Sequence, residues 1–151
     1  MEQKRKHPYL IRDYRPEDFN AVERLWQETG LGSAQRGDSA VVIARTLNMG
    51  GRLLVIEEKA SRSIVATSWL TSDGRRLYLH HFGVRPTLQG QGLAKRLLME
   101  TLRVCRQIGL QVKLEVHRDN TRAVNLYKNA GFKSLGDYQV YIIRDVGKLT
   151  L

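Results

Sequence analysis

The chain has 151 residues, one cysteine and a formal net charge of +10, from 25 Lys and Arg against 15 Asp and Glu. This length suits one domain over residues 1–151 with a full core, the single cysteine excludes an internal disulfide, and no apolar run approaches the about 18 residues of a membrane-spanning helix. The N-terminus lacks the apolar stretch of a signal peptide, so we expect a cytoplasmic protein whose positive charge favours anionic partners.

The first half of the chain alternates predicted strands and helices. A strand is expected over residues 9–14, followed by a helix that has an apolar face including Trp26 and ends at Gly30. Residues 29–39 are rich in glycine and lack apolar periodicity, which predicts a loop before a short helix through Val42, Ala44 and Leu47. Two strands then follow, joined by a polar hairpin turn; they span residues 52–58 and 63–71.

The middle of the chain predicts a strand, a glycine-bearing turn and a helix in direct succession. Residues 77–84 are rich in strand-forming side chains, and residues 93–108 keep a helical apolar spacing. The first N–H groups of such a helix are unpaired at the positive end of its dipole. Gly90 and Gly92 carry no side chains that would keep a ligand away from them. The turn is therefore a candidate site for an anion, most naturally a phosphate.

Two other phosphate loops do not fit this turn. The Walker loop requires G-x-x-x-x-G-K-[ST], and Gly92-Leu93-Ala94-Lys95 has neither that spacing nor the hydroxyl. The dinucleotide fingerprint G-x-G-x-x-G fits the two glycines, but Lys95 stands at its third glycine. The pattern that remains is Gln-x-x-Gly-x-Ala, over residues 89–94.

The last part of the chain predicts a strand, a helix and a final strand. Gly109 is a candidate C-cap, and residues 112–116 alternate apolar and polar side chains as a strand does, which makes a parallel pair with the strand before the central helix. Asn120 is a candidate N-cap for a short helix. Residues 138–144 are expected to form the final strand. Together, the predicted strands and helices indicate a mixed sheet with helices on both faces.

Two sequence motifs resemble those of the GNAT superfamily of N-acetyltransferases. The Gln-x-x-Gly-x-Ala pattern, with Val84 and Pro86 upstream, is similar to the acyl-CoA pyrophosphate loop of that superfamily. A second signature, Asn-x-x-Ala-x-x-x-Tyr followed by Gly-Phe, is matched by Asn120, Ala123, Tyr127, Gly131 and Phe132. Both lie in the last half of the chain. The resemblance implies a single-domain α/β GNAT-like fold, with a mixed twisted sheet of six or seven strands flanked by about four helices.

The resemblance also implies which residues bind acetyl-CoA as co-substrate. Backbone groups of the strand before the loop pair with the pantetheine arm in that superfamily, and the loop N–H groups hold the pyrophosphate. Asn120 is a candidate cofactor contact as well as a helix cap, and the Lys95 and Arg96 side chains are candidates to add charge or simply form a solvated helix face. The implied cofactor-binding residues are Phe82, Gly83, Val84, Gln89, Gly90, Gln91, Gly92, Leu93, Ala94, Lys95 and Asn120.

The implied reaction is direct attack of a neutral amine on the acetyl thioester through a tetrahedral intermediate. Tyr127 matches the superfamily tyrosine that donates a proton or a hydrogen bond to the departing sulfur. Reference pKa values of about 10 for tyrosine and about 8.5 for a thiol make full transfer uphill. The candidate bases are His80 and His81, with Glu115 as a further candidate. Adjacent strand residues face opposite sides, so we expect at most one histidine to point into the cleft.

The acceptor and several alternatives stay open at this point. The basic composition argues for acidic or neutral acceptors, such as small-molecule amines or a peptide N-terminus, with Trp26, Arg36 and Asp38 as candidate pocket residues. A non-catalytic acyl-CoA-binding or regulatory module is the alternative function. Nucleic-acid binding lacks support beyond the charge, and the scattered histidines and Cys105 do not form a metal site. The C-terminal strands leave room for a homodimer.

Overall fold

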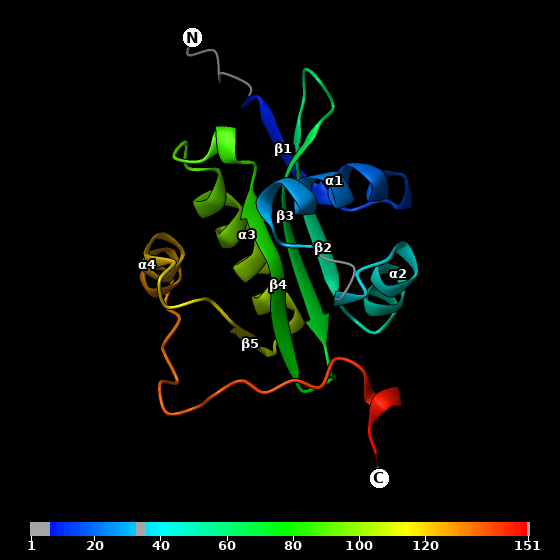
Figure 1. The fold of residues 1–151 in the computed structure, drawn as a ribbon. Coiled ribbons are helices and arrows are strands. Elements are labelled where there is room, and N and C mark those ends of the chain that lie inside the picture. Colours follow the sequence, from blue (N-terminus) through cyan, green and yellow to red (C-terminus); the bar gives the residue numbers. More distant parts are fainter. Residues whose placement is uncertain (1–6, 33–35, 151) are drawn as a thin grey trace.

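A computed structural model of the protein describes residues 7–32 and 36–150, in which five strands form one sheet between two layers of helices (Figure 1). The strands lie in sequence order: β1 (Tyr9–Asp13), β2 (Arg52–Glu58), β3 (Ile64–Ser72), β4 (Arg76–Val84) and β5 (Gln111–Leu114). Neighbours are antiparallel except β4 and β5, which are parallel. The predicted mixed α/β sheet is therefore confirmed. The N-terminal segment and part of the glycine-rich loop considered above, residues 1–6 and 33–35, lie outside the described residues.

Four α-helices cover the two faces of the sheet, as expected: α1 (Phe19–Thr29), α2 (Ala40–Asn48), α3 (Leu93–Ile108) and α4 (Thr121–Asn129). Helices α1 and α2 lie on one face, and α3 and α4 lie on the other (Figure 1). Gly30 and Gly109 end α1 and α3 in the left-handed conformation, and the Asn120 side chain caps α4 by accepting from the N–H of Ala123. These three predicted helix ends are confirmed.

Each face of the sheet has its own buried core. On the α1 and α2 side the core centres on two stacked indoles, Trp26 and Trp69, whose ring centroids are 5.5 Å apart. On the α3 and α4 side it includes Leu77 and Leu79 of β4. Burying a large aliphatic side chain is worth about 1.5–3 kcal/mol, so the two cores fix the position of β4 between them.

Strand β4 carries one extra residue relative to β3. Thr67 pairs with Gly83 and Trp69 with His80, so two steps along β3 match three along β4. The backbone of His81 has φ 44°, a left-handed conformation that is uncommon for a residue with a Cβ. The Thr67 hydroxyl donates to the His81 carbonyl at 2.7 Å and holds it there. This is a β-bulge, and it changes which face the following side chains occupy.

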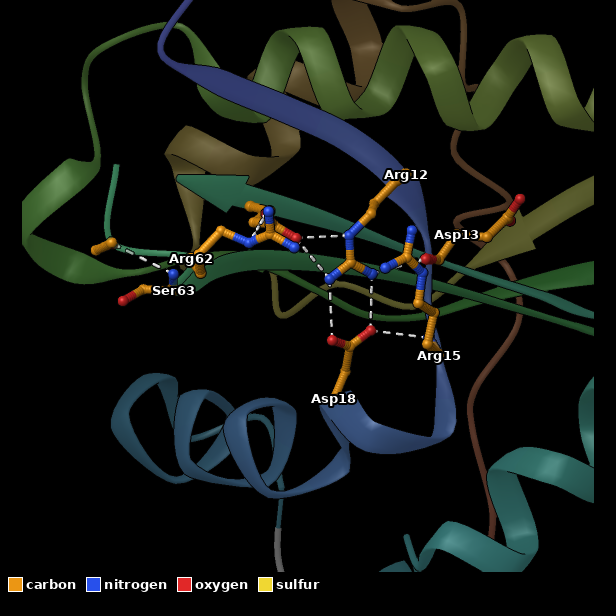
Figure 2. Close-up of polar contacts among 8 residues, drawn as sticks. Arg12, Asp13, Arg15, Asp18, Arg62 and Ser63 are labelled. Carbon is orange, nitrogen blue, oxygen red and sulfur yellow. Dashed lines mark hydrogen bonds and ion pairs between the residues drawn. The ribbon is translucent and has the colours of Figure 1, made fainter. Parts of the chain in front are cut away.

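A buried ionic group ties β1 to β2 and to the start of α1 (Figure 2). The Arg12 guanidinium donates to both carboxylate oxygens of Asp18, at 2.8 and 2.9 Å, and to Glu57 at 2.7 Å. Burial alone would raise the pKa of Asp18, but the hydrogen bonds from Arg12 and from the Arg15 N–H bring the pKa below its usual value. The side chains of Asp18 and Glu57 are only 10% and 5% exposed, so water does little to stabilise their charges. Arg12 neutralises Asp18, and Arg12 and Arg62 together neutralise Glu57, with Arg62 Nε 2.8 Å from its carboxylate.

The C-terminal segment differs from the prediction. Residues 138–144 form no strand, and the described sheet has five strands rather than six or seven. In Figure 1 the segment runs from α4 past the lower end of the sheet toward α2. Tyr138 and Tyr141 are 80% and 86% exposed. Strand propensity reports fit to a half-buried pleated surface, and this segment has no such surface beside it. Strand β5 is also shorter than predicted, because it ends at Leu114 before Val116.

Candidate active site

Strands β4 and β5 separate at one end and leave an open backbone edge. Their pairing runs from Arg76 opposite Gln111 to Leu79 opposite Leu114. Beyond this point β4 continues to Val84, whereas the chain after β5 leaves the sheet. Within the described chain, the backbone groups of β4 that face this gap have no ladder partner. An extended ligand can therefore pair with them as an added strand does.

The glycine loop lies at the end of this open edge. Gly90 and Gly92 have φ values of 82° and 80°, a conformation that costs glycine little. The N–H groups of residues 90–95 have no hydrogen-bond acceptor in the part of the chain that the structure describes. The Gln89 side chain donates to the Val84 carbonyl at 3.1 Å, so this residue fixes the loop to β4. The loop thus presents unpaired donors at the start of α3, as an anion site requires.

Arg122 is a functional candidate that the sequence analysis missed. It lies in the first turn of α4, yet its Nη2 atom is 3.4 Å from the position a Cβ would occupy on Gly90. The Arg122 guanidinium, from the motif that includes Asn120 and Tyr127, therefore lies over the backbone of the glycine loop. The sequence gives no signal for this contact, because the two residues are brought together only by the packing of α4 beside the loop.

Tyr127 lies where the two motifs meet. Its ring contacts the edges of Phe82 and Phe132, with centroids 5.8 and 5.7 Å away, and the residue is 8% exposed. Its hydroxyl has no hydrogen-bond partner among the described residues. Burial raises the pKa of Tyr127 to about 12, so the hydroxyl is protonated at neutral pH and is free to donate. The phenol is thus a donor beside the open edge of β4.

His80 and His81 both face the α1 and α2 side, so the expectation that they point to opposite faces is wrong. The bulge breaks the alternation, and the ring centroids of His80 and His81 lie 6.1 and 5.2 Å from that of Trp69. Phe82 consequently turns toward Tyr127 on the other face. A regular strand that kept all of these residues would have placed Phe82 beside Trp69.

The two histidines have different partners. The His81 Nε2 atom is 2.7 Å from a carboxylate oxygen of Asp38, and the His80 Nε2 atom is 2.8 Å from the Thr71 hydroxyl. Burial lowers the pKa of His80 to about 4. Burial also lowers the pKa of His81, but Asp38 opposes this effect. A carboxylate only accepts hydrogen bonds, so His81 carries its proton on Nε2 and its Nδ1 is unprotonated.

A cavity of about 450 Å³ adjoins the Asp38 side of this pair. Trp26 lines it and is 2% exposed, in agreement with its expected core role. Arg36 does not line this cavity and donates to the Leu31 carbonyl. Among the described residues, the cavity walls include two carboxylates and no cation; the lining residues are Glu23, Trp26, Gln27, Gly32, Gly37, Asp38 and Ser39.

The remaining predicted site residues fall into three groups. Val84 and Leu93 are buried in the core, with Ala94 half-buried beside them. Gln91, Lys95 and Asn120 are exposed around the loop and the start of α4. At Gly83 a Cβ would lie 2.7 Å from the Leu31 side chain, so glycine here admits Leu31 from the α1 side.

Other types of site are not seen in the described residues. No group of three or more His, Cys, Asp or Glu side chains is arranged to hold a metal ion among residues 7–32 and 36–150. Burial raises the pKa of the Cys105 thiol to about 11, and the residue packs in the core as expected. None of the described helices has both the length and the hydropathy to cross a bilayer.

The sequence model described as the Acetyltransferase (GNAT) family matches residues 13–132. The chain therefore belongs to the GNAT acetyltransferase family, which confirms the resemblance. Similar solved structures include glucosamine-6-phosphate N-acetyltransferase from Arabidopsis thaliana, with TM-score 0.70, 21% identity and coverage of 91% of this chain and 99% of that one. The ribosomal-protein-S18-alanine N-acetyltransferase from Escherichia coli has TM-score 0.70 and 21% identity, with 83% and 77% coverage. The PaiA N-acetyltransferase from Thermoplasma acidophilum, in complex with coenzyme A, has TM-score 0.69 and 19% identity, with 83% and 89% coverage.

Proposed function

We propose that this protein transfers the acetyl group of acetyl-CoA to a primary amine on a small molecule or a peptide N-terminus. The observation that carries the proposal is the open edge of β4, which runs directly into a loop of unpaired N–H groups. The Tyr127 phenol, whose hydroxyl has no hydrogen-bond partner in the part of the chain that the structure describes, lies beside that edge. Neighbouring structures of the same fold include one in complex with coenzyme A, which supports this ligand class.

The chain offers a binding group for each part of the cofactor. The β5-facing backbone of Phe82, Gly83 and Val84 binds the extended pantetheine arm. The N–H groups of the glycine loop bind the pyrophosphate, and Arg122 adds a positive charge over Gly90. Bound there, acetyl-CoA supplies the thioester that the amine attacks. A backbone N–H on the same edge of β4 donates to the oxygen that becomes negative.

Tyr127 assists departure of the coenzyme A thiolate as a hydrogen-bond donor. Its pKa of about 12 lies well above the about 8.5 of a thiol, so complete proton transfer to the sulfur is uphill. A hydrogen bond to a developing thiolate needs no transfer and strengthens as charge builds. The edge contacts with Phe82 and Phe132 hold the ring in place for this role.

His81 is the residue proposed to take the proton from the amine. Its Nδ1 accepts the proton, and Asp38, 2.7 Å from Nε2, stabilises the imidazolium that results. His80 shares the face but is a poor base, because its pKa of about 4 leaves it weakly basic at neutral pH. It is assigned to acceptor binding instead.

The test separates binding from turnover. Calorimetry with coenzyme A measures binding, and thiol release from acetyl-CoA with a panel of primary amines measures transfer. Micromolar binding together with release that depends on the amine supports the proposal. Absence of binding rejects it, and binding without release across a broad panel would favour a non-catalytic acyl-CoA-binding module.

A further inference from the structure

A second cavity, of about 330 Å³, lies on the same face as the two histidines and extends toward the start of β4. His80 forms part of its wall, and the adjacent residue His81 is the proposed base. A molecule whose amine lies at His81 can therefore place another group in this cavity. The lining residues are Thr71, Ser72, Asp73, Arg75, Arg76, Leu77, Tyr78, His80 and Lys113.

The charge in this cavity is opposite to that beside Asp38. Its wall carries the cations Arg75, Arg76 and Lys113 and one carboxylate, Asp73. The Asp73 carboxylate already accepts hydrogen bonds from the backbone N–H groups of Arg75 and Arg76, at 2.8 and 2.6 Å. It also lies 3.8 Å from the Arg75 guanidinium. In the described part of the chain, neither Arg76 nor Lys113 has a carboxylate within ion-pair distance.

Contacts within the protein hold the uncharged side chains of this wall, Tyr78 and His80, in place. The Tyr78 ring stacks on His80 with centroids 4.4 Å apart and planes 20° apart, and the Lys113 amine lies 5.8 Å from the Tyr78 centroid. The Thr71 hydroxyl fixes His80 from β3 at 2.8 Å. Burial and the nearby Glu115 raise the pKa of Tyr78, so its hydroxyl keeps its proton. Counting Asp73 and Glu115 against Arg75, Arg76 and Lys113 leaves two carboxylates for three cations, so the site stays positive.

We propose that this cavity binds an anionic group, a carboxylate or a phosphate, carried by the acceptor at a distance from its amine. The inference rests on the proposed acetyl transfer and names the class of acceptor. Arg76 and Lys113 bind the anion, and the stacked pair of Tyr78 and His80 forms the floor beneath it. The acidic wall near Asp38 and the basic wall near Lys113 then orient a molecule that has both charges.

The test compares acceptors that differ only in the anionic group. O-phosphoethanolamine is set against ethanolamine, and β-alanine against β-alaninamide, with kcat/KM measured for each. One or two charge-assisted contacts predict a preference of about tenfold for the anionic member of a pair, reduced by added salt. Whichever pair shows the larger preference identifies phosphate or carboxylate.

Two variants connect the preference to the cavity. Arg76→Gln combined with Lys113→Gln is expected to bring the ratio close to one and to leave kcat/KM for the uncharged amines unchanged. Lys59→Gln, in the distant turn between β2 and β3, is the control and keeps the preference. Equal rates for both members of each pair, or a preference that survives the double variant, would overturn the inference while acetyl transfer itself stands.

If the protein does not acetylate these acceptors, a binding measurement still tests the cavity. Calorimetry with O-phosphoethanolamine and with β-alanine, in the presence of coenzyme A, measures the cavity directly. Heat that disappears in the double variant supports the anion subsite. No heat with either compound overturns it, whatever the outcome of the transfer assay.

Discussion

The His81 imidazole and the Asp38 carboxylate lie 2.7 Å apart, although the two residues come from β4 and from the loop before α2. Their side chains are only 7% and 11% exposed, so water does not weaken the contact. This pair leads to the first prediction, which concerns the pH dependence of transfer.

The substitution His81→Gln is expected to lower kcat/KM by about 10²-fold or more, which is the usual contribution of a general base. The pKa of His81 is lowered by burial, so protonation of His81 reduces the wild-type rate only below the usual histidine value of about 6.5. Asp38 raises this pKa, and Asp38→Asn should therefore move the acid limb to lower pH. Pre-steady-state rates between pH 4.5 and 8 check both effects. His80→Gln is the matched control; an acid limb that follows His80 instead would reverse the assignment.

Tyr127→Phe is expected to lower kcat by about tenfold to 100-fold, because a hydrogen bond to a charged atom is worth about 1.5–3 kcal/mol. Calorimetric affinity for coenzyme A should stay within about twofold, since the phenyl ring keeps the contacts with Phe82 and Phe132. Because the pKa of Tyr127 is about 12, the wild-type rate should show no tyrosine limb below about pH 10. An unchanged kcat would show that the sulfur leaves without this hydroxyl.

Gly92→Ala and Gly109→Ala form a matched pair that separates backbone strain from ligand binding. Both glycines have φ 80°, and a Cβ meets nothing within 4 Å at either position. Each substitution should cost about 1–2 kcal/mol of folding free energy in thermal or denaturant unfolding. Only Gly92→Ala, in the loop, should weaken coenzyme A binding. Equal weakening by Gly109→Ala, at the far end of α3, would mean that the loop is not the binding site.

Arg12→Met is expected to destabilise the fold by about 3–5 kcal/mol, because it leaves the Asp18 carboxylate buried without a cation, whereas Glu57 keeps its ion pair with Arg62. Arg52→Met is the control: its pair with Asp13 is exposed, and the expected loss is within about 1 kcal/mol. Urea unfolding measures both. A loss no larger than that of the control would show that the buried carboxylates are neutralised in another way.

The Arg12 group also predicts an acid-dependent stability. The pKa of Asp18 is lowered in the folded chain, so its contribution is present above its unfolded pKa of about 3.9 and is lost as the pH falls through the lower folded value. Asp18→Asn should flatten this part of the stability profile. An unchanged acid limb in the variant would assign the loss to other carboxylates.

The exposed apolar side chains near the C-terminus predict self-association. Ile142 and Ile143 are 67% and 60% exposed and lie beside Tyr141. An apolar patch of this kind is usually covered by a partner. Sedimentation should give a mass above that of the monomer, and Tyr141→Lys with Ile142→Lys should restore the monomer. Val41→Lys, at an exposed apolar position on α2, should have no effect. A monomer at all concentrations contradicts this expectation.

The sequence predicted the parts of the site that depend on local signals. Apolar spacing identified α3, and Gly90 and Gly92 before it identified the candidate anion loop. The position of the histidines was not predictable, because a left-handed backbone at His81 has no residue signature. The contact of Arg122 with the loop and the Arg12 group join residues far apart in the chain. The final strand was predicted from β-propensity, which does not reveal whether a sheet edge lies alongside.

The extra residue in β4, His81, is the residue that supplies the proposed base. If residue 81 were deleted, His80 would still face Trp69 and Phe82 would still face Tyr127, because normal alternation would simply resume. Such a shortened strand would keep both of its hydrophobic layers but would have no imidazole beside Asp38. The proposed base is therefore an addition to a regular strand, and its ring also packs against Trp26 and Trp69, with centroids 4.4 and 5.2 Å away.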